Sequence, residues 1–208
     1  MRRLRLVGNF LVVAGAALLL LVAARVATGV RAQAKGVSLP VASSVCPPRQ
    51  VPRPVFRPVD GEAVGRLEVP RLGLDLVVFE GVSKATLRKG PGHIPGTAWP
   101  GGPDEGGNCV ITGHRDTFFR RLVDVRKGDL VRFRGPAGIS TYRLGERRVV
   151  RPEEVSVAAP TREARLTLIT CYPFSWTGSA PYRLVWKGTR VEPESPPQSL
   201  QVSGRQSR

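Results

Sequence analysis

The pattern of hydrophobic and polar positions divides the 208 residues into an apolar N-terminal run, a proline-rich segment and a region of short alternating stretches. Residues 6–24 form a run of 19 residues without a charged side chain. As a helix, this run covers about 28 Å, enough for the hydrocarbon core of a bilayer. Arg2, Arg3 and Arg5 precede the run, so the positive-inside rule predicts a cytoplasmic N-terminus at residues 1–5, a single transmembrane anchor at 6–24 and an extracytoplasmic remainder.

A cleaved signal peptide is the alternative for this run, because Ala32-Gln33-Ala34 has the small-x-small form of a cleavage site. That site lies well past the apolar run, with Arg25 and Arg31 in between. The run is also long for the core of a signal peptide. We therefore favour a retained anchor, and both interpretations place the rest of the chain outside the cytoplasm.

Residues 25–61 are rich in proline, including Pro47, Pro48 and Pro52, which disfavours a helix and favours an extended polyproline conformation. We expect this segment to be a semi-rigid stalk. At the other end, residues 191–208 are polar and lack apolar periodicity, so we expect a disordered tail. The compact domain is then predicted at residues 62–190.

Within this domain, short apolar stretches alternate with turn signals, which is typical of strands. Ser83 is expected to cap a short helix that ends at Gly90, and single helical turns are expected near Phe118 and within residues 152–160. Eight short strands with only fragments of helix predict an all-β fold, a closed β-barrel. The expected strands are 64–69, 74–79, 108–112, 130–133, 140–144, 147–150, 166–171 and 182–190.

The formal charge is +16 and divides equally between residues 1–60 and 61–208. Nucleic-acid binding is one interpretation of such a charge. However, the arginines form no dense stripe and few aromatic residues lie among them. An exported domain also has little access to nucleic acid, so we favour a cationic surface that faces anionic envelope polymers or lipids.

The chain has three cysteines, Cys46, Cys109 and Cys171, an odd number for an exported protein. Cys109 is five residues before His114, and an odd offset along a strand places two side chains on opposite faces. We therefore expect Cys109 to be a small buried apolar residue. A Cys109–Cys171 disulfide remains open at this point, and it would disable Cys171 as a nucleophile.

Three chemically useful side chains lie at the ends of different predicted strands. Cys171 ends the apolar strand Thr-Leu-Ile-Thr-Cys, His114 follows the strand 108–112 within Gly-His-Arg-Asp, and Arg183 begins the run that continues Leu-Val-Trp. One nucleophile, one base and one cation together predict nucleophilic catalysis. The two histidines, His93 and His114, are 21 positions apart, and there is no Cys-x-x-Cys pair or phosphate-binding glycine loop, so we expect no metal and no cofactor.

These motifs resemble those of the sortases, the cysteine transpeptidases of bacterial cell surfaces. Residues 167–171 match the family pattern Thr-Leu-x-Thr-Cys, the Gly-His-Arg-Asp at 113–116 is similar to the family's central region, and Arg183 falls where the family places its arginine. The resemblance covers about residues 62–190 and is closest to class D, given the Cys-Tyr-Pro-Phe and Ala-Pro-x-Arg phrases. It implies a sortase-type eight-stranded barrel with short helices.

The resemblance also implies roles for individual residues. Cys171 would attack a peptide carbonyl as a thiolate and form a thioester, and His114 would stabilise the thiolate and protonate the leaving amine. Arg183 would bind substrate carbonyls and stabilise the oxyanion. Thr170, Tyr172 and Asp116 are candidates for positioning the substrate, with simple packing as the alternative for Tyr172 and helix capping as the alternative for Asp116.

The implied reaction is transpeptidation. The enzyme would cleave a Leu-Pro-x-Thr-Gly-like sorting signal and transfer the product to an amine, on a cell-wall peptide or a pilin lysine. Its partners would be proteins with a C-terminal sorting signal, the amine acceptor and the membrane lipid around the anchor, with no nucleic acid. The alternatives are a hydrolytic cysteine peptidase that uses the same Cys171 and His114, and a non-catalytic envelope-binding barrel.

Overall fold

The computed structural model describes residues 2–35, 58–99 and 106–191. Cys46, residues 36–57 of the expected stalk and residues 192–208 of the expected tail lie outside the described residues. Two α-helices, three 3-10 helices and eight strands make up the described part. The helices are α1 (Arg2–Lys35), η2 (Pro70–Leu72), α2 (Lys84–Lys89), η3 (Arg120–Asp124) and η4 (Val155–Ala158). The strands are β1 (Ala63–Val69), β2 (Leu74–Glu80), β3 (Gly92–His93), β4 (Asn108–Gly113), β5 (Leu130–Gly135), β6 (Gly138–Val150), β7 (Arg165–Tyr172) and β8 (Tyr182–Val191).

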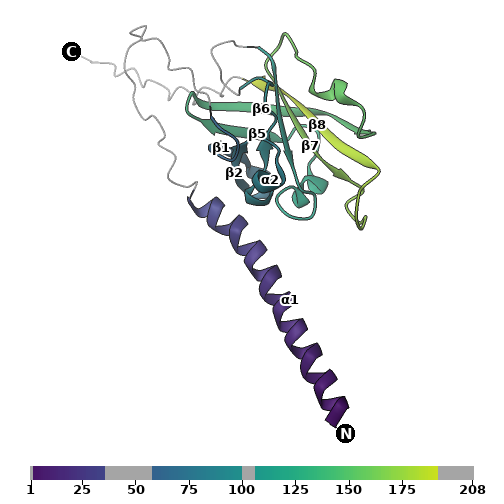
Figure 1. The fold of residues 1–208 in the computed structure, drawn as a ribbon. Helices are drawn as coiled ribbons and strands as arrows, with labels where there is room; N and C mark the ends of the chain where they lie inside the picture. Colours follow the sequence, from purple (N-terminus) through teal and green to yellow (C-terminus); the bar gives the residue numbers. More distant parts are fainter. Residues whose placement is uncertain (1, 36–57, 100–105, 192–208) are drawn as a thin grey trace, which may run out of the picture.

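The eight strands close into a barrel in the order β1-β2-β3-β4-β7-β8-β6-β5, and β5 pairs with β1 to complete the ring. Figure 1 shows this barrel at the end of the long helix α1. Closure leaves no free sheet edge around most of the ring, which is how small all-β domains avoid unpaired backbone groups. The predicted all-β closed barrel is therefore confirmed.

Alternation along each strand sends every second side chain into the barrel. The interior is filled by large apolar residues such as Leu67, Ile111, Phe133, Leu168 and Trp186, each at most 3% exposed. Burying a Leu, Ile or Phe side chain stabilises a fold by roughly 1.5–3 kcal/mol. These positions are the apolar members of the alternating pattern, so the same residues that predict the strands form the core.

A second, smaller cluster lies on the opposite face of β7 and β8. It consists of Val150, Val157 and Val185, with Ile169 packed against it, and Val157 belongs to η4 in the segment between β6 and β7. The segment between β6 and β7 therefore covers part of the outer face of the barrel, next to the last residues of β7.

The structure corrects one expected boundary between two strands. Residues 138–150 form the single strand β6, with a register shift between Leu144 and Glu146, whereas the pattern predicted two strands. A bulge inserts one residue into a strand without ending its pairing. The sequence break at Gly145 therefore marks a bulge and not a turn.

The short helices agree with the capping signals. The Ser83 hydroxyl accepts a hydrogen bond from the Thr86 N–H, 3.2 Å away, at the start of α2, and Gly90 follows its last turn. The Phe118 turn is realised as η3, and the turn expected in residues 152–160 as η4.

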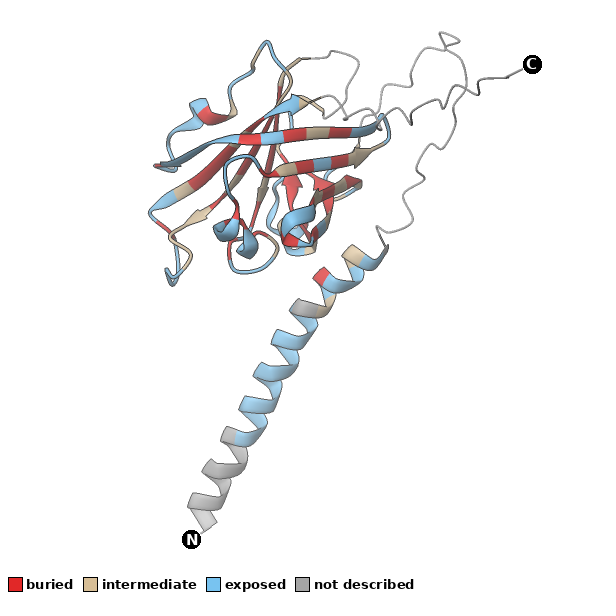
Figure 2. Cartoon of the chain, turned by 180° about the vertical axis from the view of Figure 1, so that it is seen from behind, coloured by how far each residue is buried: buried red, intermediate tan, exposed pale blue. Residues whose placement is uncertain are grey.

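Helix α1 is long and apolar enough to cross a membrane, and its described candidate span is Val12–Ala34. Figure 2 shows its surface exposed along most of its length. The helix runs to Lys35, which is eleven residues past the end of the expected anchor at residue 24. The expected boundaries of anchor and stalk stay a prediction.

Candidate active site

Strand pairing brings Cys171, His114 and Arg183 to one end of the barrel. β4 and β7 run in parallel with Gly113 opposite Thr170, so His114 and Cys171 follow at the same level. β7 and β8 are antiparallel with Cys171 directly opposite Arg183. Three residues that are up to 69 positions apart therefore share one rim of the barrel, which we name the catalytic end.

Cys171 and Arg183 also belong to the same face. Cys171 is two residues after Ile169, and Arg183 is two residues before Val185. Residues two apart in a strand lie on the same face, so Cys171 and Arg183 lie on the outer face that carries the small cluster. His114 follows Thr112, whose hydroxyl donates to the carbonyl of Ile169, 3.2 Å away. His114 is exposed, whereas Cys171 and Arg183 are half-buried, which suits a thiol that must meet a peptide substrate.

Within the described residues, these three groups are not hydrogen-bonded to one another. Arg183 Nη1 donates to the carbonyls of Ala180 and Tyr182, at 3.1 and 2.9 Å. Catalytic hydrogen bonds are often absent or long before substrate binds, so this arrangement is compatible with a resting site.

Thr170, Tyr172 and Asp116 have different surroundings. The Thr170 hydroxyl is buried and donates to the carbonyl of Gly113, 2.8 Å away, which fixes the ends of β7 and β4 relative to each other. Tyr172 is half-buried between the edge of the Phe174 ring and the Arg147 guanidinium. Asp116 is exposed, and its carboxylate has no hydrogen bond to another described residue.

Cys109 lies in the barrel core on the opposite face of β4 from His114, as the odd offset predicts. It is 1% exposed, and burial raises the pKa of its thiol far above the usual range. Cys109 and Cys171 are both free thiols. The disulfide that the sequence left open is absent from the structure, and Cys171 is the accessible thiol of the two.

The second histidine has a structural environment. His93 is 2% exposed, and its Nδ1 lies 2.8 Å from Glu80 Oε2, while Nε2 lies 3.0 Å from the Thr97 hydroxyl. Its ring stacks on Trp99 with 4.0 Å between centroids. His93 therefore supports the segment after β3. The described residues contain no group of three His, Cys, Asp or Glu side chains that could hold a metal ion.

Asn108 has a role that the sequence did not indicate. Its buried amide donates to the carbonyls of Val157 and Ala159, both 3.1 Å away, and accepts from the Thr167 hydroxyl at 2.6 Å. One side chain thus joins β4, β7 and the segment between β6 and β7. This amide therefore holds the segment between β6 and β7 against the outer face of the barrel.

Arg115 was also missed by sequence reasoning as a residue with its own function. It is 9% exposed, and its Nη2 donates to the carbonyls of Trp176 and Gly178, the latter 3.1 Å away. The residue after His114 is thereby tied to the loop between β7 and β8, which separates Cys171 from Arg183. Its position directly beside His114 was the only signal in the sequence.

We expect Arg115→Met to free the loop between β7 and β8 and to lower kcat/KM by about tenfold to hundredfold, because a small displacement of catalytic groups is costly. Arg115→Lys should recover only part of the lost kcat/KM, since an ammonium group cannot reproduce the planar fork of the guanidinium. The measurements are steady-state kinetics on a peptide substrate and limited proteolysis at residues 173–181. Arg132→Met, at an exposed position of β5, is the matched control. Wild-type rates and protease resistance in Arg115→Met would contradict this role.

Comparisons with known proteins agree with this geometry. The Sortase domain family matches residues 67–191 of the chain. Sortase D of Bacillus subtilis (strain 168) is 39% identical over 137 residues, which cover 65% of this chain and 68% of the relative. The structure of a Clostridium perfringens sortase D5 transpeptidase superposes with a TM-score of 0.59 at 25% identity, covering 65% of this chain and 83% of that chain. A Clostridium perfringens sortase C, solved with the C-terminal cell wall sorting motif, gives a TM-score of 0.59 at 26% identity over 64% of this chain and 73% of that chain.

A closed eight-stranded barrel with an accessible thiol at the end of its seventh strand is the architecture of a cysteine transpeptidase. The chain belongs to the sortase family. The family expectation drawn from the motifs, including its likeness to class D, is confirmed.

Proposed function

We propose that this sortase cleaves a Leu-Pro-x-Thr-Gly-like sorting signal through a thioester and transfers the new end to an amine. The observation that carries the proposal is the pairing of Cys171 with Arg183 on the outer face of the barrel, beside the end of the strand that leads to His114. A related sortase C has been solved with a C-terminal cell wall sorting motif, which supports a substrate of this kind.

In the first step, the Cys171 thiolate attacks the carbonyl carbon of the threonine at the scissile bond. The new carbon–sulfur bond forms as the carbonyl oxygen takes up negative charge, and Arg183 stabilises that charge. The oxyanion then re-forms the carbonyl and expels the glycine amine, which receives a proton from His114. The products are a thioester on Cys171 and a released C-terminal fragment.

In the second step, an amine attacks the thioester and displaces the Cys171 thiolate. His114 takes the proton that the attacking amine loses, which returns the imidazolium and the thiolate to their starting states. The net reaction exchanges one amide bond for another, so it needs no oxidant or reductant. Thr170 holds the ends of β4 and β7 in register, while Tyr172 and Asp116 border the substrate.

The acceptor amine comes from a cell-wall peptide or a pilin lysine, and the substrates are proteins with a C-terminal sorting signal. Helix α1 supports a single-pass anchor with the N-terminus in the cytoplasm and the barrel outside, because charged residues precede the apolar run. An anchored enzyme meets anchored substrates at a high effective concentration, which favours acyl transfer between membrane-held proteins.

The test is incubation of the full chain with a Leu-Pro-x-Thr-Gly peptide, with and without an added amine such as triglycine, followed by mass spectrometry. We expect a ligated product whose yield rises with the amine concentration. Hydrolysed peptide alone, at every amine concentration, would identify a peptidase. No cleavage, together with labelling of Cys171 by methanethiosulfonate no faster than that of a buried cysteine, would identify a non-catalytic barrel.

A further inference from the structure

The last turns of helix α1 are docked on the barrel domain. Gly29 is buried, and a Cβ at this position would lie 3.1 Å from the carbonyl oxygen of Arg88 and 3.3 Å from Cζ of Phe118. The helix therefore passes close to the end of α2 and to the segment that follows His114. Figure 2 shows the buried part of α1 near its C-terminal end, where the helix reaches the domain.

Gln33, one turn further on, completes the hydrogen bonding of strand β2. Its side-chain oxygen accepts from the Val77 N–H at 2.6 Å, and its amide nitrogen donates to the carbonyls of Val77 and Lys89, both at 3.0 Å. At Phe79, two residues along the same edge, the N–H donates to the carbonyl of Pro91. Gln33 thus makes the hydrogen bonds to Val77 that a neighbouring strand would otherwise make. Without them, the N–H and the carbonyl of Val77 would be unpaired, which would lower the stability of the fold.

Gly90 makes room for this contact. A Cβ at Gly90 would lie 2.7 Å from the Val77 carbonyl and closer still to the Gln33 amide nitrogen. Any side chain at position 90 would therefore push Gln33 away from β2. We name this contact of Gly29 and Gln33 with the barrel domain the dock. It combines three hydrogen bonds from Gln33 with a glycine, Gly90, that leaves space for the Gln33 side chain.

The dock lies at the catalytic end of the barrel. β2 is parallel to β3 with Phe79 opposite Gly92, and β3 is antiparallel to β4 with Gly92 opposite Thr112. Val77, two residues before Phe79, therefore lies level with the position just beyond Gly113, which is His114. Phe118, the other contact of α1, is four residues after His114.

Helix α1 connects this dock to the membrane without a break. The uncharged run ends at residue 24, and Gln33 follows Arg25 by eight residues, about 12 Å along a helix. That distance is about twice the thickness of one headgroup layer, which is about 5–7.5 Å. The barrel is thus held at the end of a continuous helix, as Figure 1 shows.

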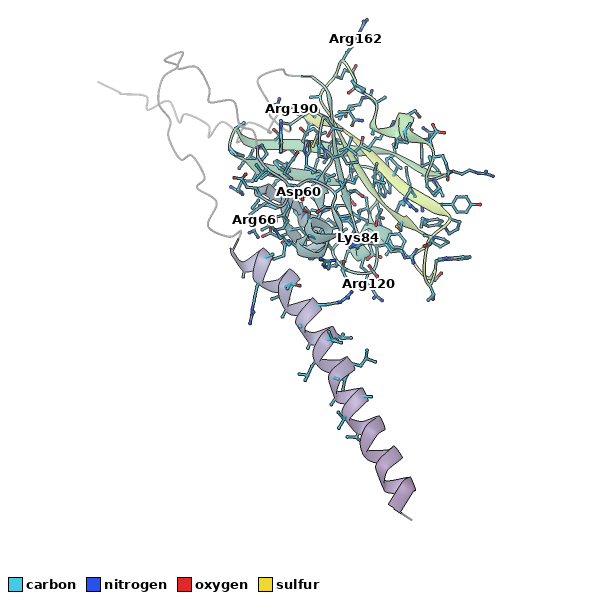
Figure 3. The ribbon with its side chains drawn as sticks, in the orientation of Figure 1. Asp60, Arg66, Lys84, Arg120, Arg162 and Arg190 are labelled. Atoms are coloured by element: carbon cyan, nitrogen blue, oxygen red, sulfur yellow. The ribbon has the colours of Figure 1, made fainter. Side chains whose placement is uncertain are left out.

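The surface near the dock suits a lipid headgroup layer. Arg88 of α2 and Arg120 and Arg121 of η3 are exposed, and none of them forms an ion pair with another described residue. In Figure 3, Arg120 lies on the side of the domain toward the helix. Val123 of η3 is 57% exposed, and Trp176, in the loop that Arg115 ties to the segment after His114, is 49% exposed. Arginines bind anionic lipid, and tryptophan prefers the membrane interface.

We infer that Gln33 and Gly29 hold the catalytic end of the barrel against an anionic membrane surface, so that the site serves substrates held in the same membrane. The inference rests on the proposed function for its substrate. Gln33 is here a positioning residue, because it acts through the orientation of the whole domain and touches no reacting atom.

The test uses the full chain in vesicles of phosphatidylcholine and phosphatidylglycerol, with two substrates. One is a soluble sorting-signal peptide, and the other is the same peptide followed by an apolar anchor in the same vesicles. Gln33→Ala should lower turnover of the anchored peptide by about tenfold, because the gain from shared anchoring depends on geometry. Turnover of the soluble peptide should stay at the wild-type level. Val30→Ala, at an exposed position of the same helix segment, is the matched control.

A second readout reports orientation without activity. Fluorescence of Trp176, assigned by comparison with Trp176→Phe, should be quenched when the vesicle lipids carry bromine on their acyl chains near the headgroup. Gln33→Ala should lose this quenching and Val30→Ala should keep it. Absence of quenching in the wild type would overturn the inference, as would an equal loss of turnover on both peptides in Gln33→Ala. Failure of the proposed function would leave both peptides uncleaved by the wild type, and the quenching would still decide the orientation.

Discussion

Cys171→Ala is expected to abolish thioester formation and to lower turnover by roughly 10⁴-fold or more, because the reaction loses its covalent route. Cys171 is free and half-buried at the end of β7, so truncating it removes few packing contacts. The measurements are product formation by mass spectrometry and the search for an acyl-enzyme in the intact protein. Circular dichroism and the melting temperature should match those of the wild type.

Cys109→Ala is the matched control, since it makes the same chemical change in the barrel core. Burial raises the pKa of the Cys109 thiol, so few thiolates form there at neutral pH. We expect Cys109→Ala to retain turnover but to lose roughly 1 kcal/mol of stability, because it leaves a small cavity. Comparable activity in Cys171→Ala and Cys109→Ala would rule out Cys171 as the nucleophile.

Arg183→Ala is expected to lower kcat/KM by about 10²- to 10³-fold, the usual cost of removing one oxyanion donor. The side chain is half-buried near the start of β8 and donates to the carbonyls of Ala180 and Tyr182, so the barrel should fold normally without it. Arg183→Lys should lie between the wild type and the alanine variant, since it keeps the charge but loses the planar fork. Steady-state kinetics on the sorting-signal peptide and thermal unfolding measure the two effects.

Arg190→Ala is the control on the same strand. Arg190 is exposed at the opposite end of β8, and Figure 3 shows it on the side of the domain away from helix α1. Its removal should leave the kinetics unchanged. Normal turnover in Arg183→Ala would contradict the role assigned to Arg183.

The alternating pattern was sufficient to predict the barrel. Leu67, Phe133 and Leu168 are apolar members of short alternating stretches, and each fills the interior as the pattern requires. The pattern failed where the backbone departs from regular pairing. The two-residue strand β3 has too few residues for a period, and the bulge at Gly145 imitates a turn.

The motifs were sufficient to predict the family and to select Cys171, His114 and Arg183 as candidates. Their roles belong to the proposed function. Arg115 and Asn108 were missed as supporting residues for a common reason. Each acts through hydrogen bonds to backbone carbonyls of residues 49 to 63 positions away, and backbone carbonyls have no sequence signature.

By itself, the sequence determined the apolar run that ends before Arg25, the strands, the family and the thiol at the end of one strand, because these depend on local composition and short motifs. Only the tertiary structure decided that Cys171 lies opposite Arg183, level with His114, and that Gln33 docks α1 beside Val77. The physical reason is that register and docking depend on hydrogen bonds between segments far apart in the chain, and such bonds are fixed only when the barrel closes.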